Sequence, residues 1–261
     1  MMTHVPPFDP GYAWFLDIDG TLLDIQAVPT AVKSRPADTQ LVTGLYAQCG
    51  GALALISGRS IAGIDAIFSP LHLPSAGQHG IERRDARGRI HRHPFPEEAL
   101  RRAAAEIQAF ATRHAGLVFE DKGASIALHY RLAPQLAGAV HTALRKAAHH
   151  LGKGVEVQGG KMVAELKPAG RNKGLAIDEF MAEPPFRGRV PIFLGDDLTD
   201  EHGFHVVNRR GGFSVKIGHG PSAAHYRLRD AAAVRSWLAE GLATLQKRGG
   251  PQKMGSEHIY R

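Results

Sequence analysis

The sequence contains a single cysteine, Cys49, among its 261 residues. One thiol excludes an intrachain disulfide and a cysteine-based zinc site, and such sparing use of cysteine fits the reducing cytosol. No apolar run approaches the roughly 18 residues that a membrane-spanning helix needs, so we expect no membrane association. The first ten residues also lack a charged segment followed by an apolar one. We therefore expect no secretion signal and a cytoplasmic protein.

The charged residues give a basic but diffuse balance. There are 32 lysines and arginines against 25 aspartates and glutamates, which is a net charge of +7. A nucleic-acid-binding protein gathers such charge into a stripe or patch. Here the basic residues are scattered, so we expect no nucleic acid partner and favour a site for an anionic small molecule. The pairs His91/His93 and His149/His150 lack zinc partners at helical spacing, and we interpret them as surface residues.

Apolar and amphipathic segments follow one another in the order strand, helix, strand near both ends of the chain. The pattern predicts strands at Tyr12–Asp17 and Ala52–Ile56 around a helix at Pro36–Gln48. Later it predicts a helix at Lys173–Met181 before a strand at Val190–Leu194. This rhythm is typical of a parallel α/β sheet with right-handed crossovers.

The middle of the chain has a different rhythm, in which two amphipathic helices are each followed by two short strands. We predict the helices at 97–114 and 134–151, the strands at 117–120, 125–130, 155–158 and 162–166, and a turn at Gly159-Gly160. The fold class is therefore α/β, with a parallel-sheet core and an inserted α+β cap domain of the αββαββ kind. We place the core at 1–83 and 169–248, the cap at 84–168 and a flexible tail at 249–261.

Two carboxylates stand directly after the first predicted strand, in Asp17-Ile18-Asp19-Gly20-Thr21. Carboxylates this close repel each other unless a cation or a shared proton offsets their charge. A hard divalent cation with oxygen ligands, Mg²⁺ above all, is the simplest partner. Gly20 leaves room for a ligand to approach the backbone, and Thr21 can donate a hydrogen bond.

Three further segments place polar groups where the same sheet edge is expected. They are Ser57-Gly58-Arg59 after the second strand, Lys173 at the start of a helix, and Gly195-Asp196-Asp197-Leu-Thr-Asp200 after the last predicted strand. The carboxyl ends of parallel strands meet at one edge of a sheet. Carboxylates, a hydroxyl and an ammonium gathered there suit phosphoryl transfer, which depends mainly on positioning and charge neutralisation.

In their order along the chain, these motifs resemble those of the haloacid dehalogenase (HAD) superfamily of phosphatases. The resemblance implies a HAD-like Rossmannoid core, with the αββαββ cap inserted between Ser57 and Lys173. Residues 12–240 are more closely similar to the trehalose-6-phosphate phosphatase family. The motifs that carry this similarity are Gly77-x-His79-Gly80, Glu120-x-Lys122, His129-Tyr130-Arg131, Gly160-Lys161-Met162-Val163-x-Glu165-Leu-Lys-Pro168 and Gly170-x-x-Lys173-Gly174.

The resemblance implies a two-step mechanism. Asp17 attacks phosphorus and forms an aspartyl-phosphate, while Asp19 protonates the leaving sugar oxygen and then deprotonates the hydrolytic water. Mg²⁺ is expected on Asp17, the main-chain carbonyl of Asp19 and Asp196. Ser57 and Lys173 are expected to hold phosphoryl oxygens, and Asp197 and Asp200 to support this shell or to orient Lys173.

The resemblance also implies a set of substrate-binding residues. In the core they are Gly20, Thr21, Gly58 and Arg59. In the cap they are Glu120, Lys122, Arg131, Lys161 and Glu165, whose polar groups can bind the hydroxyls of a disaccharide. Even spacing predicts that Lys161 and Glu165 share one face of their strand. Val163 lies between them where some relatives have Asn, which removes one possible hydrogen bond to the sugar.

The expected function is that of a monomeric, Mg²⁺-dependent enzyme that hydrolyses trehalose 6-phosphate to trehalose and phosphate. The cap residues discriminate only weakly between this and a phosphatase or mutase of another sugar phosphate, such as sucrose phosphate or a hexose phosphate. A phospho-accepting signalling module is a third alternative, because such modules also phosphorylate an aspartate beside Mg²⁺. The proton donor expected at Asp19 and the large cap count against it.

Overall fold

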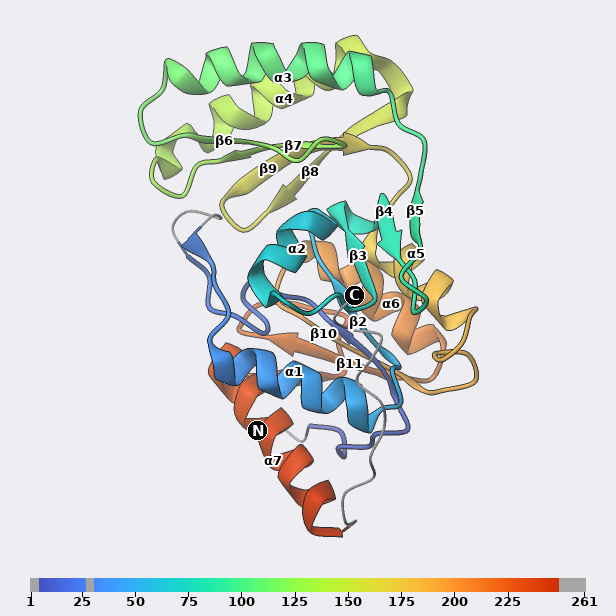
Figure 1. Ribbon diagram of the computed structural model, residues 1–261. Helices are drawn as coiled ribbons and strands as arrows, with labels where there is room; N and C mark the ends of the chain where they lie inside the picture. The colour runs from blue at the N-terminus through green and yellow to red at the C-terminus, as the bar shows by residue number, and fades with distance from the viewer. Residues whose placement is uncertain (1–4, 27–30, 249–261) are drawn as a thin grey trace.

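The computed structural model describes residues 5–26 and 31–248. The tail predicted at 249–261 lies outside the described residues. Within the described ranges the strands form two separate sheets, one of eight strands and one of four. Figure 1 shows the larger sheet with its helices in the lower part of the molecule and the smaller sheet, covered by two helices, above it.

The larger sheet has the order β12-β11-β10-β1-β2-β3-β4-β5 among the described residues. The strands from β12 to β3 are parallel, and β4 and β5 add an antiparallel edge. This confirms the predicted parallel α/β core. The strand bounds are β1 Ala13–Leu16, β2 Leu53–Ile56, β3 Ser75–Gly77, β4 Glu82–Arg84, β5 Ile90–Arg92, β10 Pro191–Gly195, β11 Phe213–Ile217 and β12 Tyr226–Leu228.

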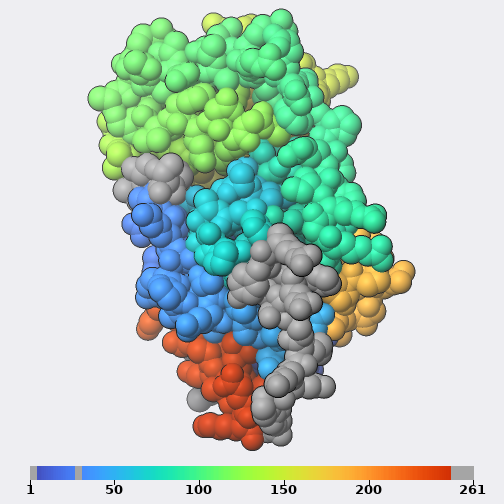
Figure 2. All heavy atoms as spheres, in the orientation of Figure 1, coloured from blue at the N-terminus to red at the C-terminus, as the bar shows by residue number. Residues whose placement is uncertain are grey.

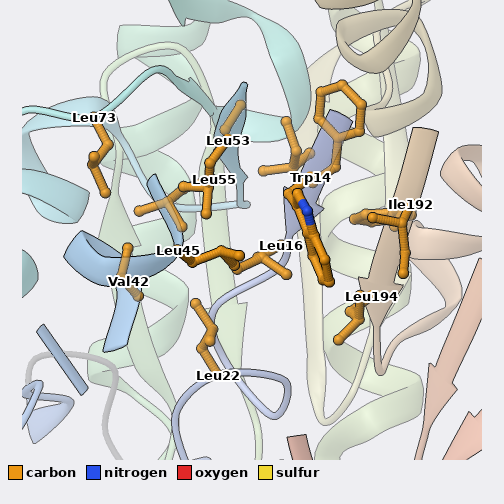
Figure 3. Close-up of a cluster of buried hydrophobic side chains, with 14 of the residues drawn as sticks. Trp14, Leu16, Leu22, Val42, Leu45, Leu53, Leu55, Leu73, Ile192 and Leu194 are labelled. Carbon is orange, nitrogen blue, oxygen red and sulfur yellow. The ribbon is translucent and has the colours of Figure 1, made fainter. Parts of the chain in front are cut away.

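Strand β1 is buried on both faces, as expected for a central parallel strand. Trp14 pairs in register with Leu53 on one side and Ile192 on the other. Figure 3 shows Trp14 and Leu16 between the side chains of β2 and β10. The Trp14 ring packs 5.7 Å from that of Trp237, whereas Phe15 stacks 5.5 Å from Phe186 on the opposite face. Successive side chains thus fill the two halves of the core.

Helices cover both faces of the larger sheet (Figure 1). Helix α1 packs against α7, and α5 packs against α6. Their bounds are α1 Pro36–Gln48, α2 Ile61–Phe68, α5 Lys173–Met181, α6 Glu201–Arg209 and α7 Ala231–Arg248. None of the helices in the part of the chain described here combines the length and the apolar character that a membrane crossing requires.

The smaller sheet is antiparallel, with the order β6-β7-β9-β8. Its strands are β6 Val118–Asp121, β7 Ile126–His129, β8 Val155–Gly160 and β9 Val163–Pro168, and its helices are α3 Glu97–Thr112 and α4 Ala137–Leu151. Both helices lie on the outer face of this sheet (Figure 1). Leu128, Leu144 and Leu166 are among the buried residues of its own hydrophobic core. The αββαββ order expected from the sequence is confirmed.

The turn predicted at Gly159-Gly160 is wrong. Strand β8 continues through Gly160, which pairs with Val163, and the turn consists of Lys161 and Met162. Met162 takes the left-handed conformation that the turn requires, with φ 64°. Gly160 serves a different purpose, because a Cβ there would lie 2.9 Å from Asp197 Oδ2. The glycine lets the tip of the β8–β9 hairpin approach the core.

The two units are joined by the segments between β5 and α3 and between β9 and α5. Figure 2 shows the atoms of the smaller unit (green) lying directly against those of the α2 segment (cyan). The larger sheet continues to Arg92, beyond the predicted boundary at residues 83 and 84. We therefore propose that the inserted unit, called the cap below, begins after β5.

Candidate active site

A cavity of about 140 Å³ lies between the carboxyl ends of the core strands and the sheet of the cap. Asp17, Ser57 and Asp196 line it from the core, directly after β1, β2 and β10. Glu120, His129 and Glu165 line it from the strands of the cap. The parallel topology thus brings segments that are far apart in the sequence to one edge, as expected.

Lys173 lies between two carboxylates at the bottom of the site. Its Nζ donates to Asp17 Oδ1 at 2.8 Å and to Asp200 Oδ1 at 2.7 Å, and all three side chains are buried. Asn172 starts α5 by accepting a hydrogen bond from the backbone N–H of Leu175, which fixes Lys173 in the first turn. Burial alone would lower the pKa of Lys173, but Asp17 and Asp200 together raise it above its usual value. The ammonium therefore stays charged.

Three carboxylates are close enough to share a cation. One oxygen each of Asp17, Asp196 and Asp200 lies within 4.8 Å of the others. Asp17 Oδ2 is buried and has no hydrogen-bond partner among the described residues. Burial raises the pKa of Asp17 well above its usual value despite the contact with Lys173, and burial together with Asp200 raises that of Asp196 to about 6. An unpartnered carboxylate oxygen in such surroundings fits a hard divalent cation.

Gly20 and Lys216 both lie against the loop that carries Asp196. A Cβ on Gly20 would lie 2.1 Å from Asp196 Oδ2, and Gly20 has φ +87°, so glycine is required there on both counts. The buried Lys216 at the end of β11 donates to the main-chain carbonyl of Asp196. These contacts hold the second acidic loop against the first.

The Asp19 side chain points to a different partner. Its two oxygens accept from Arg59 Nε at 2.6 Å and Nη2 at 2.7 Å, a bidentate ion pair. Ser57 is buried after β2, where its Oγ accepts from the backbone N–H of Arg59 at 3.2 Å. Thr21 is also fully buried, and it is not among the described residues that line the cavity.

Glu165 is the central residue of the cap side. Its Oε2 accepts from Lys122 Nζ at 3.0 Å and lies 3.1 Å from His79 Nε2 of the core. Burial alone would raise the pKa of Glu165, but Lys122 and His79 hold it well below the usual value. Nearby, Glu120 Oε2 lies 2.8 Å from His129 Nε2. Burial would likewise raise the pKa of Glu120, but its contact with His129 and the nearby charge of Lys122 together lower it.

The remaining predicted cap residues contact the core directly. Lys161 Nζ donates to Asp196 Oδ2 at 3.3 Å, and Arg131 donates to the carbonyls of Gln26 and Lys161. Lys161 belongs to the turn rather than to a strand, as described above, and its side chain is 60% exposed. Lys161, Val163 and Glu165 all line the cavity, but Lys161 precedes β9 and so does not share a strand face with Glu165 as predicted.

The two supporting aspartates differ in what they touch. Asp200 contacts Lys173, as described above, and its Oδ2 accepts from the backbone N–H of Asp197 at 2.9 Å. Asp197 accepts from the backbone N–H groups of Leu198 at 2.7 Å and Lys161 at 3.1 Å. Asp197 thus contacts the cap turn, whereas Asp200 contacts the lysine.

Several residues that shape the site had no role predicted for them from the sequence. His79 stood within a quoted motif, but its contact with Glu165 joins residues 86 positions apart. Gln78 accepts from the backbone N–H of Ala124 at 3.1 Å and so also joins core to cap. Lys216 could have been identified from the sequence, because a lysine within a mostly apolar strand needs a partner when it is buried.

Comparisons with known proteins agree with this geometry. A family model described as trehalose-phosphatase matches residues 15–232. The trehalose-6-phosphate phosphatase of Escherichia coli (strain K12) is 44% identical over 247 residues, which are 95% of this chain and 92% of that protein. A crystal structure of a trehalose-6-phosphate phosphatase related protein is 26% identical with a TM-score of 0.76, covering 89% of this chain and 98% of the other.

A fourth comparison concerns the fold alone. A HAD-superfamily phosphatase from Bacteroides thetaiotaomicron has 15% identity and a TM-score of 0.58, over 92% of this chain and 99% of its own. It supports the HAD-like architecture expected from the order of the motifs.

Proposed function

The chain belongs to the trehalose-phosphatase family, and from this premise we propose that it hydrolyses trehalose 6-phosphate to trehalose and phosphate. The observation that carries the proposal is the composition of one cavity. Its core side offers the carboxylates and the ammonium of a phosphoryl-transfer site, and its cap side offers ion-paired polar groups that can bind hydroxyls. A sugar phosphate presents both kinds of group.

The proposed chemistry begins at Asp17. A carboxylate oxygen of Asp17 bonds to phosphorus as the bond from phosphorus to the sugar oxygen breaks, and Asp19 gives that oxygen its proton. Asp19 then takes a proton from the water that attacks phosphorus and releases phosphate from Asp17. Because Asp19 is paired with Arg59 in the structure, its role as a proton donor requires this ion pair to open when the substrate enters.

The residues around Asp17 fit a divalent cation, which we propose is Mg²⁺. Asp17, Asp196 and the main-chain carbonyl of Asp19 would hold it, with Asp200 close to the same position. Such a cation would supply the positive charge that lets an ionised Asp17 approach an anionic phosphoryl group. Lys173 and Ser57 hold the remaining phosphoryl oxygens, Gly58 and Arg59 complete that end of the pocket, and Gly20 and Thr21 support it from the loop after Asp19.

The cap supplies the recognition of the sugar in this proposal. Glu165, Lys122, Glu120, Arg131 and Lys161 border the cavity from the cap. Carboxylates accept hydrogen bonds from hydroxyls and ammonium groups donate to them, so the set can bind both faces of a polyol. Ligands that lack the matching hydroxyls would not form these hydrogen bonds.

Phosphate release from a panel of sugar phosphates tests the proposal. We expect the highest kcat/KM in the presence of Mg²⁺ for trehalose 6-phosphate, above sucrose phosphate and hexose phosphates, with no turnover after chelation. The Asp17→Asn protein serves as the control for contaminating phosphatases. Equal activity on all members of the panel would reduce the assignment to a general phosphomonoesterase.

We also propose that the protein works as a monomer in the cytoplasm, without a nucleic acid partner. Both sides of the cavity come from the same chain, so the site needs no second copy. Size-exclusion chromatography with light scattering tests the monomer, and retention on a polyanion resin at modest salt tests the nucleic acid alternative.

A further inference from the structure

The contacts of the core residue His79 go beyond the packing of its side chain. It follows β3 in a short segment where Gln78 and His79 both have positive φ, 48° and 56°. Bulky residues rarely adopt this conformation, and it persists only where surrounding contacts enforce it. Here the backbone N–H groups of Gln78 and His79 donate to the carbonyls of Arg59 at 2.8 Å and Ser57 at 3.0 Å. The segment is thereby tied to the phosphate-binding motif.

The two side chains of this segment both reach the cap. Gln78 binds the backbone N–H of Ala124, and the His79 ring lies against Glu165. Gly58 leaves the space for that ring, because a Cβ there would lie 2.8 Å from both Cε1 and Nε2 of His79. The backbone of Gly58 has an ordinary φ, so space alone requires this glycine.

The contact defines which ring nitrogen of His79 carries the proton. Lys122 keeps Glu165 ionised, so Glu165 Oε2 can only accept a hydrogen bond, and His79 Nε2 must donate it. Burial lowers the pKa of His79, with Glu165 opposing this, so the ring is neutral and Nδ1 carries no proton. Nδ1 is buried and has no partner within the described ranges. His79 therefore forms its side-chain hydrogen bond through Nε2.

We propose that His79 is a positioning residue that sets the sugar selectivity of the enzyme by fixing Glu165 over the cavity. Its Nε2–H orients the Oε2 atom that Lys122 also binds, and this fixes the carboxylate of Glu165, a residue that lines the cavity where a substrate hydroxyl would bind. The residue couples the phosphate-binding segment of the core to the hydroxyl-binding carboxylate of the cap. This inference rests on the proposed function.

Two substitutions separate this role from packing. The amide nitrogen of His79→Gln reaches the position of Nε2, whereas that of His79→Asn reaches only the position of Nδ1. Asparagine tolerates positive φ better than glutamine does, so backbone strain alone would favour His79→Asn. The proposal predicts the opposite order for selectivity. Thermal unfolding first establishes that both variants are folded.

The readout is the ratio of kcat/KM for trehalose 6-phosphate to kcat/KM for nitrophenyl phosphate, which has no sugar. We expect His79→Asn to lower this ratio about tenfold or more, because a hydrogen bond to a charged group is lost, and His79→Gln to restore it to within about threefold of wild type. In a Glu165→Gln background the loss from His79→Asn should shrink to less than about twofold, since both act through one contact.

Gly58→Ala provides a second test that leaves the His79 side chain in place. The added methyl group displaces the ring from Glu165, so the same ratio should fall. Equal ratios in His79→Asn and His79→Gln, or losses that multiply in the double variant, would overturn the positioning role. If wild type itself shows no preference for trehalose 6-phosphate over other sugar phosphates, the proposed function has failed instead.

Discussion

Replacing Lys173 by methionine tests the electrostatic design of the site most directly. Methionine keeps the length and the apolar stem but removes the ammonium between Asp17 and Asp200, which are 4% and 0% exposed. Removing one partner of a buried ion pair typically costs about 3–5 kcal/mol, because the remaining charge is left uncompensated. For a chain of this size that corresponds to a fall in Tm of about 6–20 °C, at about 2–4 °C per kcal/mol. Phosphatase activity should fall by orders of magnitude.

The loss of stability caused by Lys173→Met should grow as the pH rises. Burial already raises the pKa of Asp17, and removing Lys173 removes the contact that lowers it. A group with a raised pKa in the folded state favours folding in its protonated form, and that contribution disappears as the pH rises through the folded value. The variant should therefore come closest to wild type near the usual aspartate pKa of about 4 and fall behind it as the pH rises towards neutrality.

Thermal unfolding at pH 4 and pH 7, without divalent metal, measures both effects. Lys146→Met is the matched control, since Lys146 is exposed on α4 and its replacement should change Tm by no more than about 1–2 °C. Added Mg²⁺ should raise the Tm of Lys173→Met more than that of wild type, because no ammonium competes for the carboxylates. A Tm at pH 7 equal to that of wild type would refute the reasoning.

Three further predictions concern catalysis. Asp17→Asn keeps the shape but removes the attacking charge, so phosphate release should fall by orders of magnitude in a folded protein; near-wild-type turnover would contradict the covalent mechanism. Asp19→Asn should reduce turnover of trehalose 6-phosphate more than that of nitrophenyl phosphate, whose leaving group needs little protonation, and equal losses would argue against Asp19 as the acid. Glu165→Ala should cost about 1–3 kcal/mol in kcat/KM for trehalose 6-phosphate, and Lys161→Ala less, because Lys161 is 60% exposed and exposed ion pairs contribute little. Both losses should be much smaller on nitrophenyl phosphate; proportional losses would make these residues structural.

Local signals were sufficient for the elements that carry the core motifs. The helices at Pro36–Gln48 and Lys173–Met181 have the predicted bounds, and the buried strands before Asp17 and Ser57 were visible as apolar runs. Strand β4 gave no such signal, because its sequence is Glu82-Arg83-Arg84. All three residues are buried nonetheless. Arg84 binds Asp65, and Arg83 binds Glu179 and Glu183, partners that no local pattern reveals.

In the candidate site, too, the sequence was enough to place some residues but not to reveal their contacts. Spacing after predicted strands was enough to gather Asp17, Ser57 and Asp196, because a parallel sheet fixes which ends meet. It could not show that the Asp19 carboxylate pairs with Arg59 while Asp200 joins the acidic cluster, since both depend on side-chain direction. The contact between His79 and Glu165 also requires the relative placement of two sheets.

The core side and the cap side of the cavity differ in charge. This difference explains how one cavity can bind both the phosphate and the sugar of a sugar phosphate. On the core side, the cluster of Asp17, Asp196 and Asp200 contacts the ammonium groups of Lys173, from the core, and Lys161, from the cap. That excess of negative charge disfavours a phosphate group unless a divalent cation offsets it. On the cap side, Glu165 is balanced by Lys122, and Glu120 is paired with His129. Paired donors and acceptors of this kind suit neutral hydroxyls. The phosphate is therefore expected to bind only together with the metal. The paired residues of the cap, in contrast, are expected to bind the sugar whether or not the metal is present.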